Sequence, residues 1–288
     1  MHELPLSRDR HLTLGALPAV MAILNVTPDS FSDGGRFAGA RAAADEGLRA
    51  YDAGAAIVDV GGESTRPRGK TYGEGARPVS AAEELARVLP VVRALRSARP
   101  SLPISVDTRK AEVAGAALDE GADVVNVVTG LDVDPELLAL VASRGAGLVL
   151  NHCRGTPETT FTISKFTDVV AEVGADLAVA RGRARAAGVP PDRVIVDPGF
   201  GFGKSPAESY ALLARLADLE PKGAPLLVGA SRKGFLDVAG APANERLPES
   251  LAAVVLAARA CRERPVIVRV HDAAETVRFL TVLARASA

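Results

Sequence analysis

Eight short apolar segments recur along the chain, and the stretches between them have the composition and periodicity of helices. Each segment is apolar at nearly every position, which is typical of parallel strands buried on both faces. Eight strands that alternate with helices predict an α/β fold, a single (β/α)8 TIM-barrel domain spanning residues 1–288. The predicted strands are Val20–Leu24, Ala56–Val60, Ile104–Val106, Val124–Val127, Gly147–Leu150, Val194–Val196, Pro225–Val228 and Val266–Val270.

The predicted helices include Ala81–Arg99, Lys110–Glu120, Asp168–Ala187 and Glu249–Arg262. Before the first strand, we expect a short hairpin at about residues 8–18, around His11–Leu17, over the closed end of the barrel. The helix 249–262 is apolar on nearly every side, whereas a helix that covers a barrel needs only one apolar stripe. Its outer face is therefore expected to be buried in a homodimer.

The charge and composition exclude several classes of protein. The net charge is −1 and no Lys/Arg cluster is present, which argues against binding to nucleic acid or to a membrane surface. No segment approaches the roughly 20 apolar residues that span a bilayer, and Met1–Pro5 does not begin a signal peptide. Cys153 and Cys261 lie far apart in sequence, which favours reduced thiols and a cytoplasmic location.

Almost every predicted strand ends in a polar residue or a glycine-rich turn. In a TIM barrel these ends converge on the C-terminal mouth, where the loops build the active site. Asn and Asp are favoured in turns, but that preference would explain only one or two of the eight polar ends. The sequence therefore predicts an active site formed by Asn25, Asp59 with Gly61–Glu63, Asp107, Asn126, Asn151 with His152, Asp197, Ser231–Lys233, and Arg269 with His271.

Six motifs at these strand ends carry a family resemblance: Asn25–Gly35, Asp59–Pro67, Ser105–Thr108, Asp197–Lys204, Gly229–Lys233 and Arg269–Asp272. In this order the chain resembles the dihydropteroate synthases, from about Val20 to the final helix. The resemblance implies condensation of 6-hydroxymethyl-7,8-dihydropterin pyrophosphate with para-aminobenzoate. The products are 7,8-dihydropteroate, on the way to folate, and pyrophosphate, and such an enzyme is a target of sulfonamides.

The resemblance also implies a role for each group of residues. Asp107, Asn126, Asp197 and Lys233 would bind the pterin, and Asn25, Arg269 and His271 would bind the pyrophosphate, with Mg²⁺ at Asn25. Para-aminobenzoate would contact Phe31, Thr65, Pro67, Phe202 and Ser231. Catalysis would rest on Asp107, Lys233, Asn25, Arg269 and His271.

The chemistry of the two substrates suits these residue types. The pterin edge presents several N–H donors, which carboxylates can accept, and a carbonyl to which an ammonium can donate. Arg269 and His271 stand two positions apart, so both can face the mouth from one strand. Ser231–Lys233 is expected to begin a helix whose N–H groups bind the carboxylate of para-aminobenzoate.

Some residues depart from the family pattern or invite another interpretation. Val127 replaces the usual Asp, and Asn151 and Cys153 replace methionines on either side of His152. We expect His152 to be a packing residue and Cys153 a small core substitute. Gly203-Lys204-Ser205 does not complete a phosphate-binding loop, since Pro198 occupies the place of its first glycine, and the glycine spacing also fails the dinucleotide pattern.

Three other functions also fit parts of the sequence. A Schiff-base aldolase would use Lys233 or Lys204 as its reactive lysine. A non-catalytic pterin-binding paralogue would bind the pterin but release no pyrophosphate, and Val127 and Asn151 motivate it. A methyltransferase that uses a methylated folate would share the pterin carboxylates without needing Phe31 or Thr65.

Overall fold

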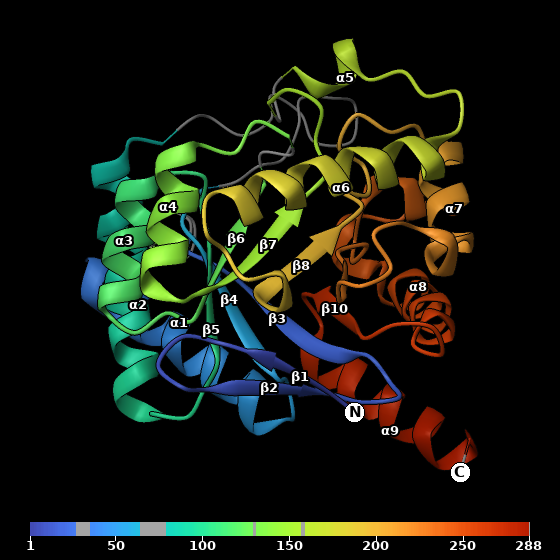
Figure 1. Cartoon of the computed structure of the whole chain (residues 1–288). Helices are drawn as coiled ribbons and strands as arrows, with labels where there is room; N and C mark the ends of the chain where they lie inside the picture. Colours follow the sequence, from blue (N-terminus) through green and yellow to red (C-terminus); the bar gives the residue numbers. More distant parts are fainter. Residues whose placement is uncertain (27–34, 64–78, 129–130, 157–158, 288) are drawn as a thin grey trace.

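The computed structural model describes residues 1–26, 35–63, 79–128, 131–156 and 159–287. Eight parallel strands close a barrel in the order β10-β3-β4-β5-β6-β7-β8-β9, which confirms the predicted TIM barrel (Figure 1). Each strand begins and ends within one residue of its predicted bounds. The strands are β3 Ala19–Asn25, β4 Ile57–Gly61, β5 Ile104–Asp107, β6 Val124–Val127, β7 Gly147–Asn151, β8 Val194–Asp197, β9 Leu226–Val228 and β10 Val266–Val270.

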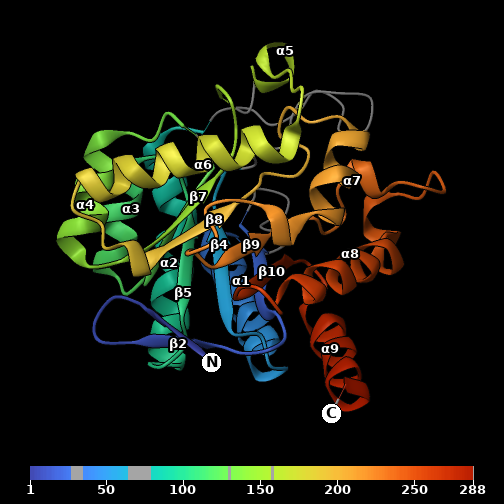
Figure 2. The ribbon, with the colours of Figure 1, turned by 45° about the vertical axis from the view of Figure 1, so that its right-hand side comes forward.

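Helices surround the barrel, as the two views of the ribbon show (Figures 1 and 2). Two of them start at capping boxes, in which Ser80 pairs with Glu83 and Ser205 with Glu208. Among the described residues, no helix is long and apolar enough to cross a membrane. The α-helices are α1 Gly35–Asp52, α2 Ala81–Ala98, α3 Ala111–Asp119, α4 Pro135–Arg144, α5 Thr160–Ile163, α6 Val169–Ala186, α7 Pro206–Ala214, α8 Leu247–Ala260 and α9 Ala273–Ser287. Short 3₁₀ turns are η2 Pro191–Arg193, η3 Leu216–Asp218, η4 Gly234–Leu236 and η5 Ala243–Glu245.

The predicted hairpin is present at the closed end of the barrel, but it starts earlier than predicted. Strand β1 (His2–Pro5) pairs antiparallel with β2 (His11–Leu14), at the lower end of the barrel in Figure 1. Its leucines pack against barrel residues such as Met21 and Ile57 in one buried cluster. The first strand was missed because it contributes only two leucines, Leu4 and, just beyond its end, Leu6.

Inside the barrel, an apolar layer gives way to a polar one toward the mouth. The apolar layer consists of Met21, Ile57, Val124, Val149, Ile195, Leu227 and Ile267, which pack with the hairpin. Side chains alternate along a strand, so the residue two positions later also points inward, nearer the mouth. On five strands that residue is polar: Asp59, Asn126, Asn151, Asp197 and Arg269. Strand alternation thus gathers these side chains at one end of the barrel.

At the opposite end, a buried ion cluster ties the hairpin to the barrel. Asp123 has no exposed surface and accepts hydrogen bonds from Arg10 Nε at 2.7 Å and Arg96 Nη2 at 2.7 Å. It also accepts from Ser7 Oγ and the backbone N–H of Ile104, each at 3.0 Å. Because every donor belongs to the base of the barrel, Asp123 has a structural role there.

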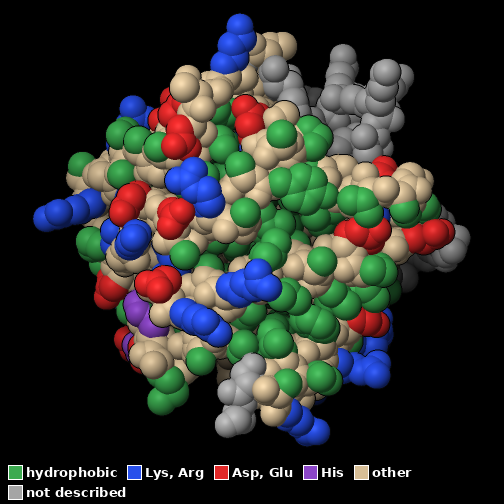
Figure 3. Space-filling view, turned by 90° about the vertical axis from the view of Figure 1, so that its right-hand side faces the viewer, with side chains coloured by type: hydrophobic (Ala, Val, Ile, Leu, Met, Phe, Trp, Pro, Cys, Tyr) green, Lys and Arg blue, Asp and Glu red, His purple; other side chains and the backbone are tan. Residues whose placement is uncertain are grey.

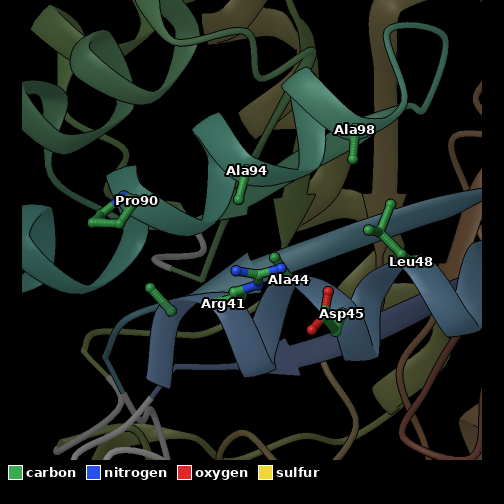
Figure 4. A pocket seen from close by; sticks show the side chains of 8 residues that line it. Arg41, Ala44, Asp45, Leu48, Pro90, Ala94 and Ala98 are labelled. Atoms are coloured by element: carbon green, nitrogen blue, oxygen red, sulfur yellow. The ribbon is translucent and has the colours of Figure 1, made fainter. Parts of the chain in front are cut away.

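A surface groove runs between α1 and α2, as the close view in Figure 4 shows. Its walls are mostly small or apolar, including Ala44 and Leu48 on α1 and Ala94 and Ala98 on α2. None of the polar strand ends lines it, so the groove does not belong to the barrel mouth.

Candidate active site

Arg269 joins carboxylates from two other strands at the centre of the mouth. Its Nε donates to Asp59 Oδ2 at 2.6 Å, and its Nη2 donates to Asp107 Oδ2 at 2.7 Å. The same oxygen of Asp59 accepts from Asn126 Nδ2 at 3.0 Å. Strands β10, β4, β5 and β6 thus place Arg269, Asp59, Asp107 and Asn126 together, although Arg269 is far from the other three in sequence.

Asp59 is the residue of this group to which the sequence analysis gave no role. It has no exposed surface, and its Oδ1 has no hydrogen-bond partner among the described residues. Because an ionised carboxylate only accepts, the Asn126 amide nitrogen faces Asp59, and the amide oxygen is left for other donors. A charged residue within the apolar strand β4, two positions after the inward-facing Ile57, is the sequence signal that identifies it.

Burial at the mouth shifts two pKa values toward neutrality, and neighbouring charges modify both shifts. Burial raises the pKa of Asp107 to about 7; Arg269 opposes the shift, and the nearby Asp59 carboxylate adds to it. Burial lowers the pKa of Lys233 to about 8, a shift that the Asp197 carboxylate opposes. An acid and a base with displaced pKa values in one site are typical of functional centres.

Lys233 and Phe202 form one wall of the mouth. The ammonium of Lys233 donates to the backbone carbonyl of Phe200 and lies 4.6 Å from the centroid of the Phe202 ring. That position allows a cation–π attraction between the two side chains. Phe202 is buried and packs with Val128 and Cys153. The predicted pterin and para-aminobenzoate contacts are thus direct neighbours here.

Asp197 lies at the end of β8, buried and opposite Asn151 in the β7–β8 register. Its Oδ1 accepts from the backbone N–H of Gly199 at 2.7 Å. Its Oδ2 would lie 3.5 Å from a Cβ placed on Gly229, which locates this oxygen at the end of β9. One oxygen of Asp197 therefore orders the following loop, while the other faces the neighbouring strand end.

The predicted pyrophosphate residues lie at two adjoining places. Asn25 is exposed at the end of β3, and its Oδ1 and Asp107 Oδ2 would lie 3.9 and 3.8 Å from a Cβ on Gly61. A glycine thus keeps open the space between these two side chains. His271, just beyond β10, has Nδ1 3.1 Å from Ser231 Oγ, and its backbone N–H donates to the same oxygen at 3.3 Å.

The helix expected at Ser231–Lys233 is not formed. Arg232 adopts a left-handed conformation with φ of 59°, and only the three-residue η4 follows. The left-handed turn is held because Arg232 donates its backbone N–H to Ser250 Oγ at 3.0 Å and pairs its guanidinium with Asp272. The proposed binding of a carboxylate to helix N–H groups at this point is therefore wrong.

The departures from the family pattern fall on different sides of the strands. Val127 belongs to the core between barrel and helices, so it points away from Asn126 and the mouth. Asn151 faces the interior, and its Oδ1 has no hydrogen-bond partner among the described residues. Cys153 is fully buried in a small apolar cluster, as predicted for a core substitute. Phe31, Thr65 and Pro67 lie outside the described residues.

His152 is buried, as expected of a packing residue, but it also belongs to a polar network. Its Nδ1 lies 3.0 Å from Lys204 Nζ, and its Nε2 lies 3.0 Å from Asp176 Oδ2. Burial lowers the pKa of His152 to about 4, and the Lys204 charge lowers it further. The imidazole is therefore neutral near pH 7.

Comparison with known proteins identifies the family. The model of the family described as "Pterin binding enzyme" matches residues 21–271. The chain belongs to the pterin-binding enzymes. All the mouth residues described above lie within the matched segment or, for His271, at its final position.

Several proteins similar to this pterin-binding enzyme are named dihydropteroate synthases. It is 44% identical to the dihydropteroate synthase of Mycobacterium leprae, over 92% of both chains. It is also similar to the structure of Xanthomonas albilineans dihydropteroate synthase with 4-aminobenzoic acid, with a TM-score of 0.86 and 42% identity over 99% and 98% of the two chains. A probable bifunctional folylpolyglutamate synthase/dihydropteroate synthase of Haloferax volcanii is 44% identical, but the match covers only 30% of that longer protein.

Proposed function

We propose that this pterin-binding enzyme is a dihydropteroate synthase, which joins 6-hydroxymethyl-7,8-dihydropterin pyrophosphate to para-aminobenzoate and releases pyrophosphate. One observation carries the proposal. Asp107 and Asn126 are held at the barrel mouth by contacts to Arg269 and Asp59, in a chain 44% identical to a synthase over 92% of both lengths. The same mouth therefore contains pterin acceptors and a cation suited to pyrophosphate.

Recognition of the pterin follows from the charges at the mouth. Asp107, Asp197 and the amide oxygen of Asn126 accept from the N–H donors of the pterin edge. Lys233 donates to the pterin carbonyl and ring nitrogen. Each charge-assisted contact that is shielded from water contributes about 1.5–3 kcal/mol. A ring that lacks these donors would leave the buried acceptors unpaired and bind poorly.

Pyrophosphate binds beside the pterin at Arg269, His271 and Asn25. Among the described residues, the contacts of Arg269 to Asp59 and Asp107 use Nε and Nη2, so Nη1 can donate to a phosphate oxygen. His271 donates from its imidazole when its other ring nitrogen is paired with Ser231. The two carboxylates thus hold Arg269 in place for the leaving group.

The donor set also fits a Mg²⁺ ion that arrives with the pyrophosphate. Mg²⁺ prefers oxygen ligands and usually keeps waters and substrate phosphates in its shell. The amide oxygen of Asn25 is such a ligand, and the described residues contain no group of three or more His, Cys, Asp or Glu that could hold an ion by themselves. When bound, Mg²⁺ would neutralise charge on the leaving pyrophosphate.

The residues support a reaction in which pyrophosphate departs first. The bond between the exocyclic methylene and the pyrophosphate oxygen breaks, and its electron pair leaves with the pyrophosphate. Asp107 stabilises the positive charge that spreads over the methylene and the pterin ring. The neutral amine of para-aminobenzoate then attacks the methylene and loses a proton to solvent, so no activating base is needed.

Para-aminobenzoate is expected to lie against Phe202 and Ser231, with Phe31, Thr65 and Pro67 supplying further contacts. Phe202 offers an apolar face beside Lys233, and Ser231 offers a hydroxyl beside His271. An aryl sulfonamide has a similar ring and amine, so sulfonamides should compete for this place.

We also propose that the enzyme is a homodimer in the cytoplasm. Hydrophobic side chains gather on the face that carries α7 and α8 (Figure 3). Leu251, Val255 and Leu256 on α8 remain partly exposed, and Tyr210 is 41% exposed on α7. Contiguous apolar surface of this kind marks interfaces, and a second copy is the partner that we propose. Cys153 and Cys261 are both thiols, as expected in the reducing cytoplasm.

Product formation tests the proposed function directly. Incubation of the protein with both substrates and Mg²⁺ should give 7,8-dihydropteroate, detected by mass spectrometry. The Lys233→Met variant should lose most of this product. A covalent adduct trapped by borohydride at Lys233 or Lys204 in the presence of a carbonyl compound, without dihydropteroate, would instead support the aldolase alternative. Transfer of a methyl group from a methylated folate would support the methyltransferase.

A further inference from the structure

A buried lysine lies behind the mouth and has no role in the reaction described above. Lys204 is only 3% exposed. Its ammonium lies 2.9 Å from the carbonyl oxygen of Gly199, 3.1 Å from that of Phe202 and 3.4 Å from that of His152. It also donates to His152 Nδ1 at 3.0 Å and lies 5.8 Å from the centroid of the Phe166 ring. Among the described residues, its hydrogen-bond partners are therefore backbone carbonyls and an imidazole rather than a carboxylate.

The imidazole connects Lys204 to helix α6. His152 Nδ1 accepts from the ammonium, so the proton of the neutral ring is on Nε2, which donates to Asp176 at 3.0 Å. Asp176 also accepts from Arg154 Nε at 2.8 Å. Arg154 Nη2 donates in addition to Glu172 Oε2 at 3.0 Å, and Glu172 lies on α6 like Asp176. The position of Lys204 is thus fixed from the outer helix as well as from the strand ends.

The two nearest carbonyls bracket a loop that bends through three left-handed glycines. Gly199, Gly201 and Gly203 have φ of 67°, 74° and 63°. A glycine-rich segment has many alternative conformations, so it needs contacts to hold one of them. Lys204 supplies these contacts because it binds the carbonyl at the start of the loop, Gly199, and the carbonyl near its end, Phe202.

The same loop supplies two contacts to Lys233. The carbonyl of Phe200 accepts from the Lys233 ammonium, and the ring of Phe202 lies 4.6 Å from the same ammonium. A shift of the loop would therefore move Phe202 and release Lys233. We propose that Lys204 is a positioning residue that sets Lys233 against the pterin and Phe202 against para-aminobenzoate. This inference rests on the proposed synthase function.

The test compares two variants that remove similar structural contacts. Lys204→Met keeps most of the length of the side chain but removes its hydrogen bonds to the loop. The matched control is Arg264→Met, since Arg264 is also buried and donates to the carbonyls of Leu219, Pro221 and Ala224 before β10, away from the mouth. Both variants should melt at a lower temperature. Only Lys204→Met should change the kinetics, with the KM for para-aminobenzoate raised about tenfold or more and kcat reduced.

A milder variant covers the case in which Lys204→Met does not fold. Asp176 is 21% exposed, so Asp176→Asn is expected to fold while weakening the hold on His152 and Lys204. The KM for para-aminobenzoate should rise by roughly threefold in this variant. Folded Lys204→Met with kcat and both KM values within twofold of the parent would overturn the proposal. An equal change in Arg264→Met, or an unchanged KM in Asp176→Asn when Lys204→Met cannot be made, would also overturn it.

A second measurement separates this proposal from the synthase function. Competitive acetylation of the ligand-free protein, followed by mass spectrometry, reports how exposed and reactive Lys233 is. Lys233 should react faster in Lys204→Met than in the parent or in Arg264→Met. If the parent protein makes no dihydropteroate but Lys233 still reacts faster in Lys204→Met, the positioning role is supported while the proposed function is rejected. Unchanged reactivity in an active enzyme would reject the positioning role alone.

Discussion

The substitution Asp197→Asn tests how the mouth binds the pterin. One carboxylate oxygen of Asp197 accepts from Gly199 N–H at 2.7 Å, and the other is available to the pterin edge. The amide of an asparagine has only one oxygen, so it can satisfy either Gly199 or the pterin. Its NH₂ group then faces an N–H donor in the other direction, in a side chain that is 4% exposed.

The expected cost combines a lost charge-assisted contact with an unpaired buried donor. The first contributes about 1.5–3 kcal/mol, and the second about 1–3 kcal/mol. A total of about 3 kcal/mol corresponds to roughly a hundredfold increase in the pterin Kd. Calorimetric titration with the pterin pyrophosphate would measure it. A Kd within a factor of two of the parent would refute the assigned role.

The matched control is Asp123→Asn, because Asp123 is also buried and hydrogen-bonded but lies at the base of the barrel. This variant should lower the melting temperature, since it removes the partner of Arg10 and Arg96. Its pterin Kd should stay unchanged. An equal loss of affinity in both variants would show that general destabilisation, rather than the Asp197 contact, weakens binding.

Three further predictions concern pH, binding order and assembly. The pterin binds when Asp107 is ionised and Lys233 is protonated. Because the pKa of Asp107 is about 7, the affinity for 6-hydroxymethyl-7,8-dihydropterin should rise as the pH increases through 7. Because the pKa of Lys233 is about 8, the affinity should fall again above pH 8. A flat calorimetric profile between pH 6 and 9 would contradict these roles. Para-aminobenzoate and sulfonamides should bind about 5–150-fold more tightly when pyrophosphate and a pterin acid are present, because Mg²⁺-pyrophosphate at Asn25 and Arg269 favours the state of the mouth that receives the second substrate. Equal affinities in paired titrations would exclude this order. Light scattering at micromolar concentration should give the mass of a dimer, and Leu251→Glu on α8 should give a monomer; a parent protein of monomeric mass would exclude the proposed interface.

The barrel was predictable because its strands are buried on both faces. The runs Val194–Val196 and Val266–Val268 are apolar at successive positions, and each is followed directly by a polar residue, Asp197 or Arg269, that the fold brings to the mouth. Asp107, Asn126 and Arg269 were identified in this way; Arg269 contacts Asp107 directly and is linked to Asn126 through Asp59.

Contacts between distant segments were harder to predict. Asp59 was recognised as a strand end, but its role depends on Arg269, which is 210 residues away along the chain. His152 and Lys204 have ordinary local contexts, and their pairing depends on the packing of β7 against the loop after β8. The prediction of a helix beginning at Ser231 was wrong because contacts to Ser250 and Asp272, rather than the local sequence, set the conformation of Arg232.

The central claim is that the barrel mouth joins the two substrates and expels pyrophosphate. Its most direct test is a coupled assay of pyrophosphate release in the presence of Mg²⁺, with each substrate alone and with both together. We predict release that requires both substrates and equals the dihydropteroate formed, mole for mole. Tight binding of the pterin pyrophosphate without any release of pyrophosphate would contradict the claim and identify a non-catalytic pterin-binding protein.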